Sequence, residues 1–351
     1  LYEIKDMFSI KKVVAYLLSI TSLLLIHSAL MAKTPVAILY DDIFLEHNTG
    51  SGHPERPERL FDIIDTLKNN PDFKYDLVWP KVRKASNSEI ALAHSEKYIQ
   101  LVENEIRALD SQTPTFLSTG DTVISPISLD VAQMSVGASL VGIDEIMNGN
   151  VKAAFSFNRP PGHHATKDKG MGFCIYNHAA IAAKYLQHKY SLSRVLIIDF
   201  DVHHGNGTQD IFYDDPPVFY FSIHQHPFYP GSGRPNETGI ADGEGFTLNI
   251  DLAEGSGDDL FIKGFSEQLV PKMKDFKPEF ILISAGFDAH ENDLLGKLSY
   301  TSNGYKQVAR LINTIYKNSN AKGIMYMLEG GYLPENIDNA SQAIIKELLE
   351  L

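Results

Sequence analysis

Four ionisable side chains lie close together where an apolar run ends. The stretch IIDFDVHHGNGTQD, residues 197–210, begins with branched apolar residues and then brings in Asp199, Asp201, His203 and His204. Burying an isolated carboxylate costs several kcal/mol, so such a cluster at the end of a buried strand needs a compensating partner. A metal ion is one such partner, because carboxylates and imidazoles bind metals.

The spacing of these residues predicts a metal site. Asp201 and His203 are one residue apart, and alternate residues of an extended chain point the same way. They can therefore converge on one point, and Asp288, which follows another apolar run, can complete the set. Three protein ligands leave one position open for water, as in catalytic zinc sites. Hydrogen-bonded carboxylates beside a core histidine are the competing interpretation.

Two adjacent histidines supply acid–base chemistry. His163 and His164 lie in RPPGHHATKD, a loop rich in proline and glycine. One can take a proton from water and return it to a leaving amine, and the other can hold positive charge near a developing oxyanion. Asp199 can accept a ring N–H from one of them and raise its basicity. Asn206 can serve the other, with a smaller effect on the pKa because it is neutral.

Tyr332 and Cys174 also carry reactive groups. Tyr332 follows EGG, and its phenol can donate to a carbonyl oxygen or an oxyanion. Loss of such a donor costs roughly 3–4 kcal/mol in other enzymes. Cys174 is the only cysteine of the chain. Thiol catalysis is one interpretation of it, but free cysteines are among the most buried residues, which favours a small packing group.

The elements that must position these groups form an α/β pattern. Short, continuous apolar runs are typical of strands covered on both faces. They cover residues 35–42, 151–157, 194–200, 217–224, 246–252, 280–288 and 323–331. Helix-like stretches lie between them, among them residues 128–149, 177–190 and 259–276. This alternation predicts a mainly parallel sheet with helices on both faces, in a single three-layer domain.

In such a sheet the ligand site lies beyond the carboxyl ends of the strands. Five of the predicted strands are followed by polar residues at that end. These residues are His163 and His164, Asp201 and His203, His224 and Tyr229, Asp288, and Tyr332. Their common position indicates one site.

The composition fits an ordinary globular protein and limits its partners. Apolar residues make up 44% of the chain and charged residues 21%, and no linker or repeat divides it after residue 35. The net charge of −13 argues against general nucleic-acid binding, which needs a basic surface. Such charge serves solubility first, and attraction of basic partners such as lysine-rich peptides or polyamines is the alternative.

Residues 1–33 are expected to be a leader, with the catalytic domain spanning 34–351. Met7 starts MFSIKK, and an apolar segment follows that ends in small residues near Ala32, the pattern of a signal peptide. The segment is also long enough for an uncleaved membrane anchor, without which we expect no stable membrane domain. A start at Met7 predicts a secreted or periplasmic protein, and a start at Met31 predicts a cytoplasmic one.

Several segments of the chain together resemble the histone deacetylase superfamily of zinc amidohydrolases, in its class II branch. They are RPPGHHATKDKGMGFCIYNHAAIAA, IIDFDVHHGNGTQDIFY, YPGSG, SAGFDAHENDLLG and LEGGY, with HPERPERL and AHSEKYI before them. The resemblance implies an arginase/deacetylase fold with a central sheet of about eight strands. It also implies that Asp201, His203 and Asp288 bind one zinc ion.

The resemblance assigns further roles. His164 would be the general base and acid, His163 its electrostatic partner paired with Asp199, and Tyr332 the group that polarises the acetyl carbonyl. An asparagine at Asn206 is usual for class II. The tunnel for the acyl-lysine stem would be lined by Gly172, Phe173, Tyr229 and Leu295. A structural potassium ion would be bound by Asp199, Asp201, His203, Ser222 and Ile223.

Two departures leave the substrate open. Tyr229 stands where the family more often has phenylalanine, and Asp121 in STGDTVISP is the candidate for the rim acid that grips the substrate backbone. The expected reaction is hydrolysis of N-acetyl-lysine in proteins, including histones, which releases acetate and free lysine. Small acetylated amines such as acetylpolyamines are the alternative substrates.

Two other functions are disfavoured. A binuclear manganese ureohydrolase needs more carboxylates, whereas His204 and His290 follow the predicted ligands here. A non-catalytic acyl-lysine reader would lack a catalytic group, whereas His163, His164 and Tyr332 are all present.

Overall fold

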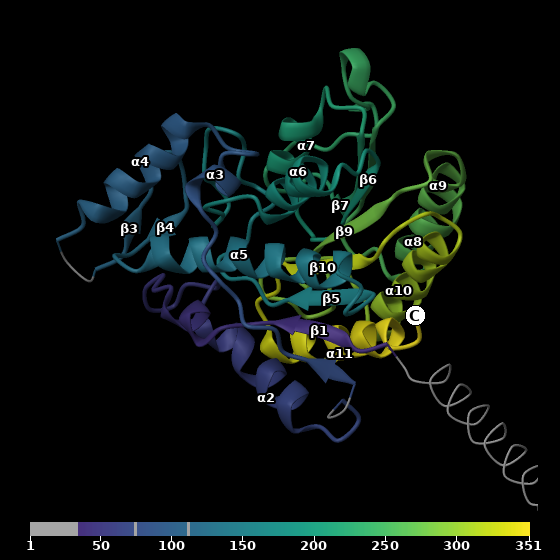
Figure 1. The fold of residues 1–351 in the computed structure, drawn as a ribbon, viewed down its shortest axis with the longest axis horizontal. Helices are drawn as coiled ribbons and strands as arrows, with labels where there is room; N and C mark the ends of the chain where they lie inside the picture. Colours follow the sequence, from purple (N-terminus) through teal and green to yellow (C-terminus); the bar gives the residue numbers. More distant parts are fainter. Residues whose placement is uncertain (1–33, 74–75, 111–112) are drawn as a thin grey trace, which may run out of the picture. The chain divides into compact units, whose positions relative to one another are not determined.

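An eight-stranded parallel sheet forms the centre of the protein (Figure 1). The computed structural model describes residues 34–73, 76–110 and 113–351, so the leader predicted for residues 1–33 lies outside the described residues. The strand order is β2-β1-β5-β10-β9-β6-β7-β8, and each pairing in this sheet is parallel. The strands are β1 (Val36–Leu39), β2 (Leu77–Val78), β5 (Ala153–Ser156), β6 (Val195–Asp199), β7 (Val218–Gln225), β8 (Thr247–Leu252), β9 (Phe280–Ala285) and β10 (Ile324–Leu328). The predicted α/β class and strand number are confirmed.

Seven of these strands arise from the seven apolar runs of the sequence. The eighth, β2, is two residues long and pairs with β1 at one edge of the sheet. A strand of this length has no periodicity that a sequence pattern could reveal.

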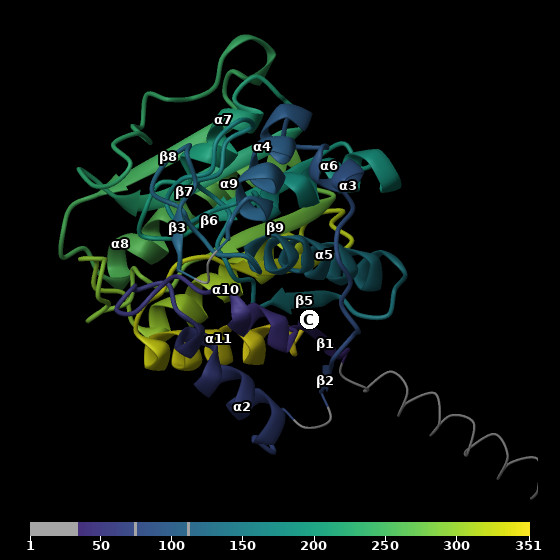
Figure 2. The same ribbon diagram turned by 90° about the vertical axis from the view of Figure 1, so that its left-hand side faces the viewer.

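Helices cover both faces of the sheet and make three layers (Figures 1 and 2). On one face, α5 (Ser128–Met147) packs on β1, β5 and β10, while α6 (His178–Tyr190) packs on β6 and β9. On the other, α11 (Pro334–Leu348) packs between α2 (Phe61–Asn69) and α10 (Ser302–Lys317).

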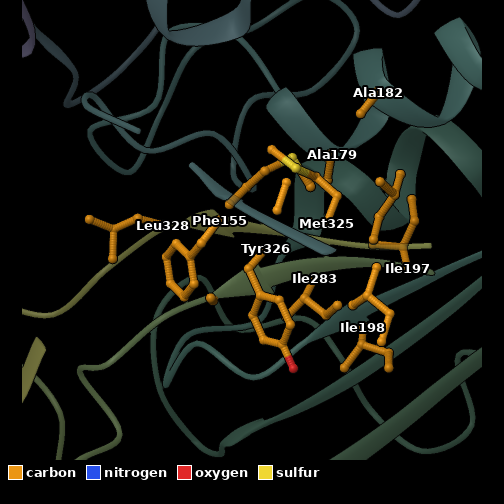
Figure 3. Close-up of a cluster of buried hydrophobic side chains, with 14 of the residues drawn as sticks. Phe155, Ala179, Ala182, Ile197, Ile198, Ile283, Met325, Tyr326 and Leu328 are labelled. Carbon is orange, nitrogen blue, oxygen red and sulfur yellow. The ribbon is translucent and has the colours of Figure 1, made fainter. Parts of the chain in front are cut away.

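Alternate residues of the central strands fill the two faces of the core. Figure 3 shows Met325 of β10 directed toward Ala179 of α6, whereas Tyr326 lies on the opposite side of the sheet. There the Tyr326 ring stacks on Phe155 of β5, with ring centroids 5.4 Å apart. All four side chains are fully buried, which explains why these strands are continuous apolar runs.

The helix expected over residues 259–276 is interrupted. It consists of α8 (Asp258–Lys263), a π-helical turn η4 (Gly264–Leu269) and α9 (Val270–Phe276). Pro271, near the start of α9, has no N–H to donate, and a π turn before it accommodates the missing hydrogen bond.

The remaining elements are short or peripheral. They are α3 (Asn87–Ile90), α4 (Glu96–Arg107), α7 (Asn206–Phe212), a hairpin of β3 (Thr115–Phe116) and β4 (Val123–Ile124), and the 3₁₀ turns η1 (Asp42–Glu46), η2 (Pro57–Leu60) and η3 (Ala241–Gly243). Among the described helices, none has the length and apolar character needed to cross a membrane.

Candidate metal and catalytic site

Asp201, His203 and Asp288 converge where two neighbouring strands end. Asp201 and His203 follow β6, and Asp288 follows β9, which pairs with β6. The His203 Nδ1 atom lies 3.0 Å from Asp201 Oδ1 and 3.3 Å from Asp288 Oδ2. The three candidate ligand atoms all lie within 4.8 Å of one another, and both carboxylates are fully buried. The predicted triad therefore forms one cluster.

The surroundings of this cluster fit a bound cation. Asp288 Oδ2 is buried and accepts no hydrogen bond within the described residues, an expensive arrangement without a positive charge beside it. Glycines keep the space around the carboxylates free. A Cβ on Gly330 would lie 2.0 Å from Asp288 Oδ2, and a Cβ on Gly286 would lie 2.3 Å from Asp201 Oδ2. One imidazole nitrogen with two carboxylate oxygens is a donor set that suits a divalent metal ion such as zinc.

The pKa of Asp288 points the same way. Burial, and then the negative charge of Asp201, raise the pKa of Asp288 above its ordinary value. Ionising Asp288 beside Asp201 therefore carries an electrostatic cost that a divalent cation would relieve.

The two predicted imidazoles lie side by side with their predicted partners. Their ring centroids are 4.0 Å apart. His163 Nδ1 lies 3.0 Å from Asp199 Oδ2, and His164 Nδ1 lies 2.8 Å from Asn206 Oδ1. Both histidines follow β5 on a loop that contains a cis Arg159–Pro160 peptide bond.

The partners give the two imidazoles opposite pKa shifts. Burial alone would lower the pKa of His163, but the charges of Asp199 and Asp201 outweigh it and raise that pKa well above its ordinary value. Burial lowers the pKa of His164, and the positive charge of His163 lowers it further. His163 is therefore the imidazole suited to hold a positive charge, and His164 is the neutral one that can accept a proton.

Tyr332 reaches the same site from the loop after β10. Its main-chain N–H donates to Asp293 Oδ2 at 2.7 Å, and the Arg59 guanidinium lies 5.1 Å from its ring centroid. Arg59 also donates to the carbonyls of Glu329 and Gly331, at 2.5 Å each. Burial raises the pKa of the phenol well above its ordinary value, so the hydroxyl remains a proton donor.

One small cavity of about 120 Å³ joins these groups. His163, His164, His203 and Tyr332 line it, as do the four residues of the predicted tunnel, Gly172, Phe173, Tyr229 and Leu295. Gly172 has a φ of 56°, and a Cβ there would lie 2.2 Å from His164 Cδ2, so the wall requires glycine.

The candidate rim acid Asp121 also lines the cavity. It is exposed, and its Oδ1 accepts the N–H of Gly172 at 2.7 Å. Tyr229 lies edge-on to His164, with ring centroids 5.1 Å apart. Burial and then the charge of Asp121 raise the pKa of the Tyr229 hydroxyl. The structure thus places an acid and a phenol together at the cavity wall.

The predicted potassium ligands come from adjacent strands. Asp199 of β6 pairs in register with Ser222 of β7, and Ile223 is the next residue. Asp201 and His203 complete this set just after β6. The residues therefore share one neighbourhood, and potassium binding stays a prediction.

Four other candidates take structural positions. His204 bonds with Ser232 and Gln209, and His290 bonds with Ser302 and the Glu291 carbonyl, so neither histidine extends the metal cluster. His224 was expected just beyond its strand, but it lies within β7 and bonds with Ser222 and the Gly233 carbonyl. Cys174 is buried, and burial raises the pKa of its thiol, which disfavours thiol catalysis.

Sequence reasoning missed a buried ionic group that contacts the segment carrying Tyr332. Glu55 Oε1 accepts from Arg159 Nε at 2.6 Å and from Arg59 NH1 at 3.1 Å, and all three side chains are fully buried. Glu329, also fully buried, was missed as well. The arginines of HPERPERL and RPPG were a signal, because arginine is seldom buried without a partner.

The fold and the site together define a class of protein. It is an α/β protein with a candidate metal centre and an imidazole pair at the carboxyl ends of the strands of a parallel sheet. The chain belongs to the histone deacetylase family, whose domain, described as "Histone deacetylase domain", matches residues 53–348.

Individual relatives agree with this assignment. The chain is 37% identical over 305 residues to "Histone deacetylase 10, chloroplastic" of Oryza sativa subsp. japonica, covering 84% of this chain and 69% of that protein. It is 36% identical over 299 residues to "Probable deacetylase" of Archaeoglobus fulgidus, covering 85% and 81% respectively. The crystal structure of the HDA15 HD domain superimposes with a TM-score of 0.84 at 34% identity, covering 91% of this chain and 89% of that chain. The fold resemblance predicted from the sequence motifs is confirmed.

Proposed function

We propose that this protein is a zinc-dependent hydrolase that removes the acetyl group from N-acetyl-lysine side chains of proteins. The observation that carries the proposal is the meeting of three kinds of group in one cavity. These are His203, which belongs to the buried ligand triad, the imidazole pair with its opposite pKa shifts, and the phenol of Tyr332. Membership of the deacetylase family supports the same reaction.

Asp201, His203 and Asp288 would hold the ion. Zinc, when bound, would act as a Lewis acid that polarises the amide carbonyl. It would also lower the pKa of a water molecule, so that this water can lose a proton and attack near neutral pH. His164 would accept the proton of the attacking water and then deliver it to the departing lysine amine. Tyr332 would donate its hydroxyl to the carbonyl oxygen as negative charge develops there.

His163 and Asp199 would act together beside that proton transfer. The Asp199 carboxylate holds the ring of His163 through Nδ1 and favours its positive form. Burial, and then the positive charge of His163, would keep its neighbour His164 neutral in the resting site, ready to accept a proton. In this arrangement His163 would keep its positive charge, while His164 would gain and then lose a proton.

The cavity suits a narrow, unbranched substrate stem. Phe173 and Tyr229 both line it, and Phe173 lies edge-on to Tyr332, with ring centroids 6.2 Å apart. The four methylene groups of a lysine side chain can pack along such walls while the acetamide reaches the catalytic groups. Potassium near Asp199 and Ser222 would stabilise the loop that carries the ligands.

Small acetylated amines are the second candidate substrates. The observation in their favour is the exposed carboxylate of Asp121 at the cavity wall, which could attract the ammonium group of an acetylpolyamine. The test compares kcat/KM for an acetyl-lysine peptide and for N-acetylputrescine or N-acetylspermidine on the same zinc-loaded protein. We expect the peptide to be the better substrate, and a clear preference for the polyamines would replace the first proposal by the second.

A further inference from the structure

Glu329 is a buried acid to which the proposed reaction assigns no role. It follows β10 directly and precedes Gly330, Gly331 and Tyr332, and its side chain is fully buried. Within the described part of the chain, no lysine or arginine forms an ion pair with it. Burying such a carboxylate costs several kcal/mol unless hydrogen bonds satisfy its oxygens. Its hydrogen bonds therefore indicate what the acid is for.

The carboxylate is bound mainly to the histidine loop. Glu329 Oε2 accepts the main-chain N–H of Gly162 at 2.6 Å and that of His163 at 3.1 Å. The other oxygen, Oε1, accepts the hydroxyl of Ser284, a residue of β9, at 2.9 Å. Glu329 thus ties the loop after β5 to the ends of β9 and β10.

The main chain at Glu329 is fixed from the other directions. The Glu329 carbonyl accepts from Arg59, and the next residue, Gly330, donates its N–H to Asp201 Oδ2 at 2.8 Å. Two residues further on, Tyr332 enters the cavity. One short segment therefore contacts the candidate metal ligands, carries the phenol and, through the Glu329 side chain, binds the main chain at Gly162 and His163.

We propose that Glu329 is a positioning residue whose reach, rather than its charge, sets the distance between the imidazole pair and Tyr332. The inference rests on the proposed function, because it concerns the groups assigned to that reaction. A misplacement of about 1 Å in an active site can cost roughly 10²-fold in rate, so loss of this contact should be seen in kcat.

Two substitutions separate the effect of side-chain length, which sets the reach of Glu329, from the effect of its charge. Glu329→Gln keeps the length of the side chain: its amide oxygen can accept both N–H groups and its NH₂ group can donate to Ser284. Glu329→Asp keeps the charge but shortens the side chain by one carbon–carbon bond, about 1.5 Å, so it cannot hold both N–H groups. Ser284→Ala is the matched control, because it removes a hydrogen bond from the same carboxylate without touching the histidine loop.

The experiment measures kcat and KM per bound zinc for the whole protein and the three variants on an acetyl-lysine peptide. We expect kcat to fall on the order of 10- to 100-fold in Glu329→Asp, with KM and zinc content close to those of the parent protein. Glu329→Gln and Ser284→Ala should stay within about threefold in kcat, a change smaller than roughly 1 kcal/mol. A merely structural role would lower the thermal stability of Glu329→Asp and leave kcat per bound zinc as it was.

A second readout does not depend on turnover. NMR of ¹⁵N-histidine-labelled protein follows the ring proton that His163 shares with Asp199. We expect its resonance to shift in Glu329→Asp and to remain in place in Glu329→Gln. Equal kcat in both glutamate variants, or a larger loss in Glu329→Gln, overturns the inference. If the parent protein shows no deacetylation at all, the proposed function fails, and the NMR comparison still decides the role of Glu329.

Discussion

Replacing Tyr332 by phenylalanine should remove one hydrogen bond to the reacting carbonyl and little else. The ring would keep its contacts with Arg59 and Phe173, and the backbone would keep its bond to Asp293. The Tyr332 hydroxyl makes no hydrogen bond to any other described residue, so its removal leaves no partner unsatisfied. The cost should therefore appear in the transition state rather than in folding.

The expected loss in kcat is about 10²–10³-fold, which corresponds to roughly 2.7–4 kcal/mol for one oxyanion donor. The assay measures acetate release from an acetyl-lysine peptide together with the zinc content of the same sample. Tyr326→Phe is the matched control, because it removes a hydroxyl from β10 that lies in the core, outside the cavity. Full activity in Tyr332→Phe would refute the role given to the phenol, as would a loss of activity explained by loss of zinc.

Two other predictions concern stability and substrate binding. Arg159 and Arg59 outweigh the effect of burial and lower the pKa of Glu55 from 4.5 to about 2. The ionised form therefore stabilises the fold above pH 4.5, and this stabilisation is lost as the pH falls toward 2. Glu55→Gln should destabilise the protein by about 3–5 kcal/mol at neutral pH. Thermal melts should show the difference in stability between the parent protein and the variant shrinking below pH 4.5. A difference that stays constant with pH would contradict this assignment. Asp121→Asn should raise KM for an acetylpolyamine at most about fivefold with kcat retained, because an exposed ion pair contributes roughly 0–1 kcal/mol. A fall in kcat alone would argue against substrate binding by Asp121 at the rim of the cavity.

The metal ligands could be predicted from the sequence because they come directly after the apolar runs that indicate buried strands. Asp201 and His203 follow an apolar run directly, and the rule that ligands bind beyond the carboxyl ends of parallel strands brings Asp288 to the same edge. Residue type indicated that Asp199 would accept a ring N–H from one of the two histidines, and the family resemblance assigned it to His163, as the structure has it.

The supporting contacts could not be predicted in this way. Glu329 binds main-chain N–H groups 167 and 166 residues away in the sequence, and Arg59 binds a carbonyl 270 residues away. Every residue has a carbonyl and nearly every residue has an N–H, so residue type does not show which main-chain group a buried side chain will bind. The π turn at Gly264–Leu269 was missed for a similar reason, because a helical pattern of apolar residues does not show a local change in hydrogen bonding.

The most direct test is a zinc titration of the metal-stripped protein. The protein is treated with a chelator, its residual metal is quantified, and Zn²⁺ is added back in fractions of an equivalent while acetate release from an acetyl-lysine peptide is measured. With Asp201, His203 and Asp288 as a single-ion site, activity should be absent at the start, rise in proportion to zinc and level off at one equivalent per chain. Turnover by protein shown to be free of metal, or a requirement for two equivalents, would contradict the proposed site.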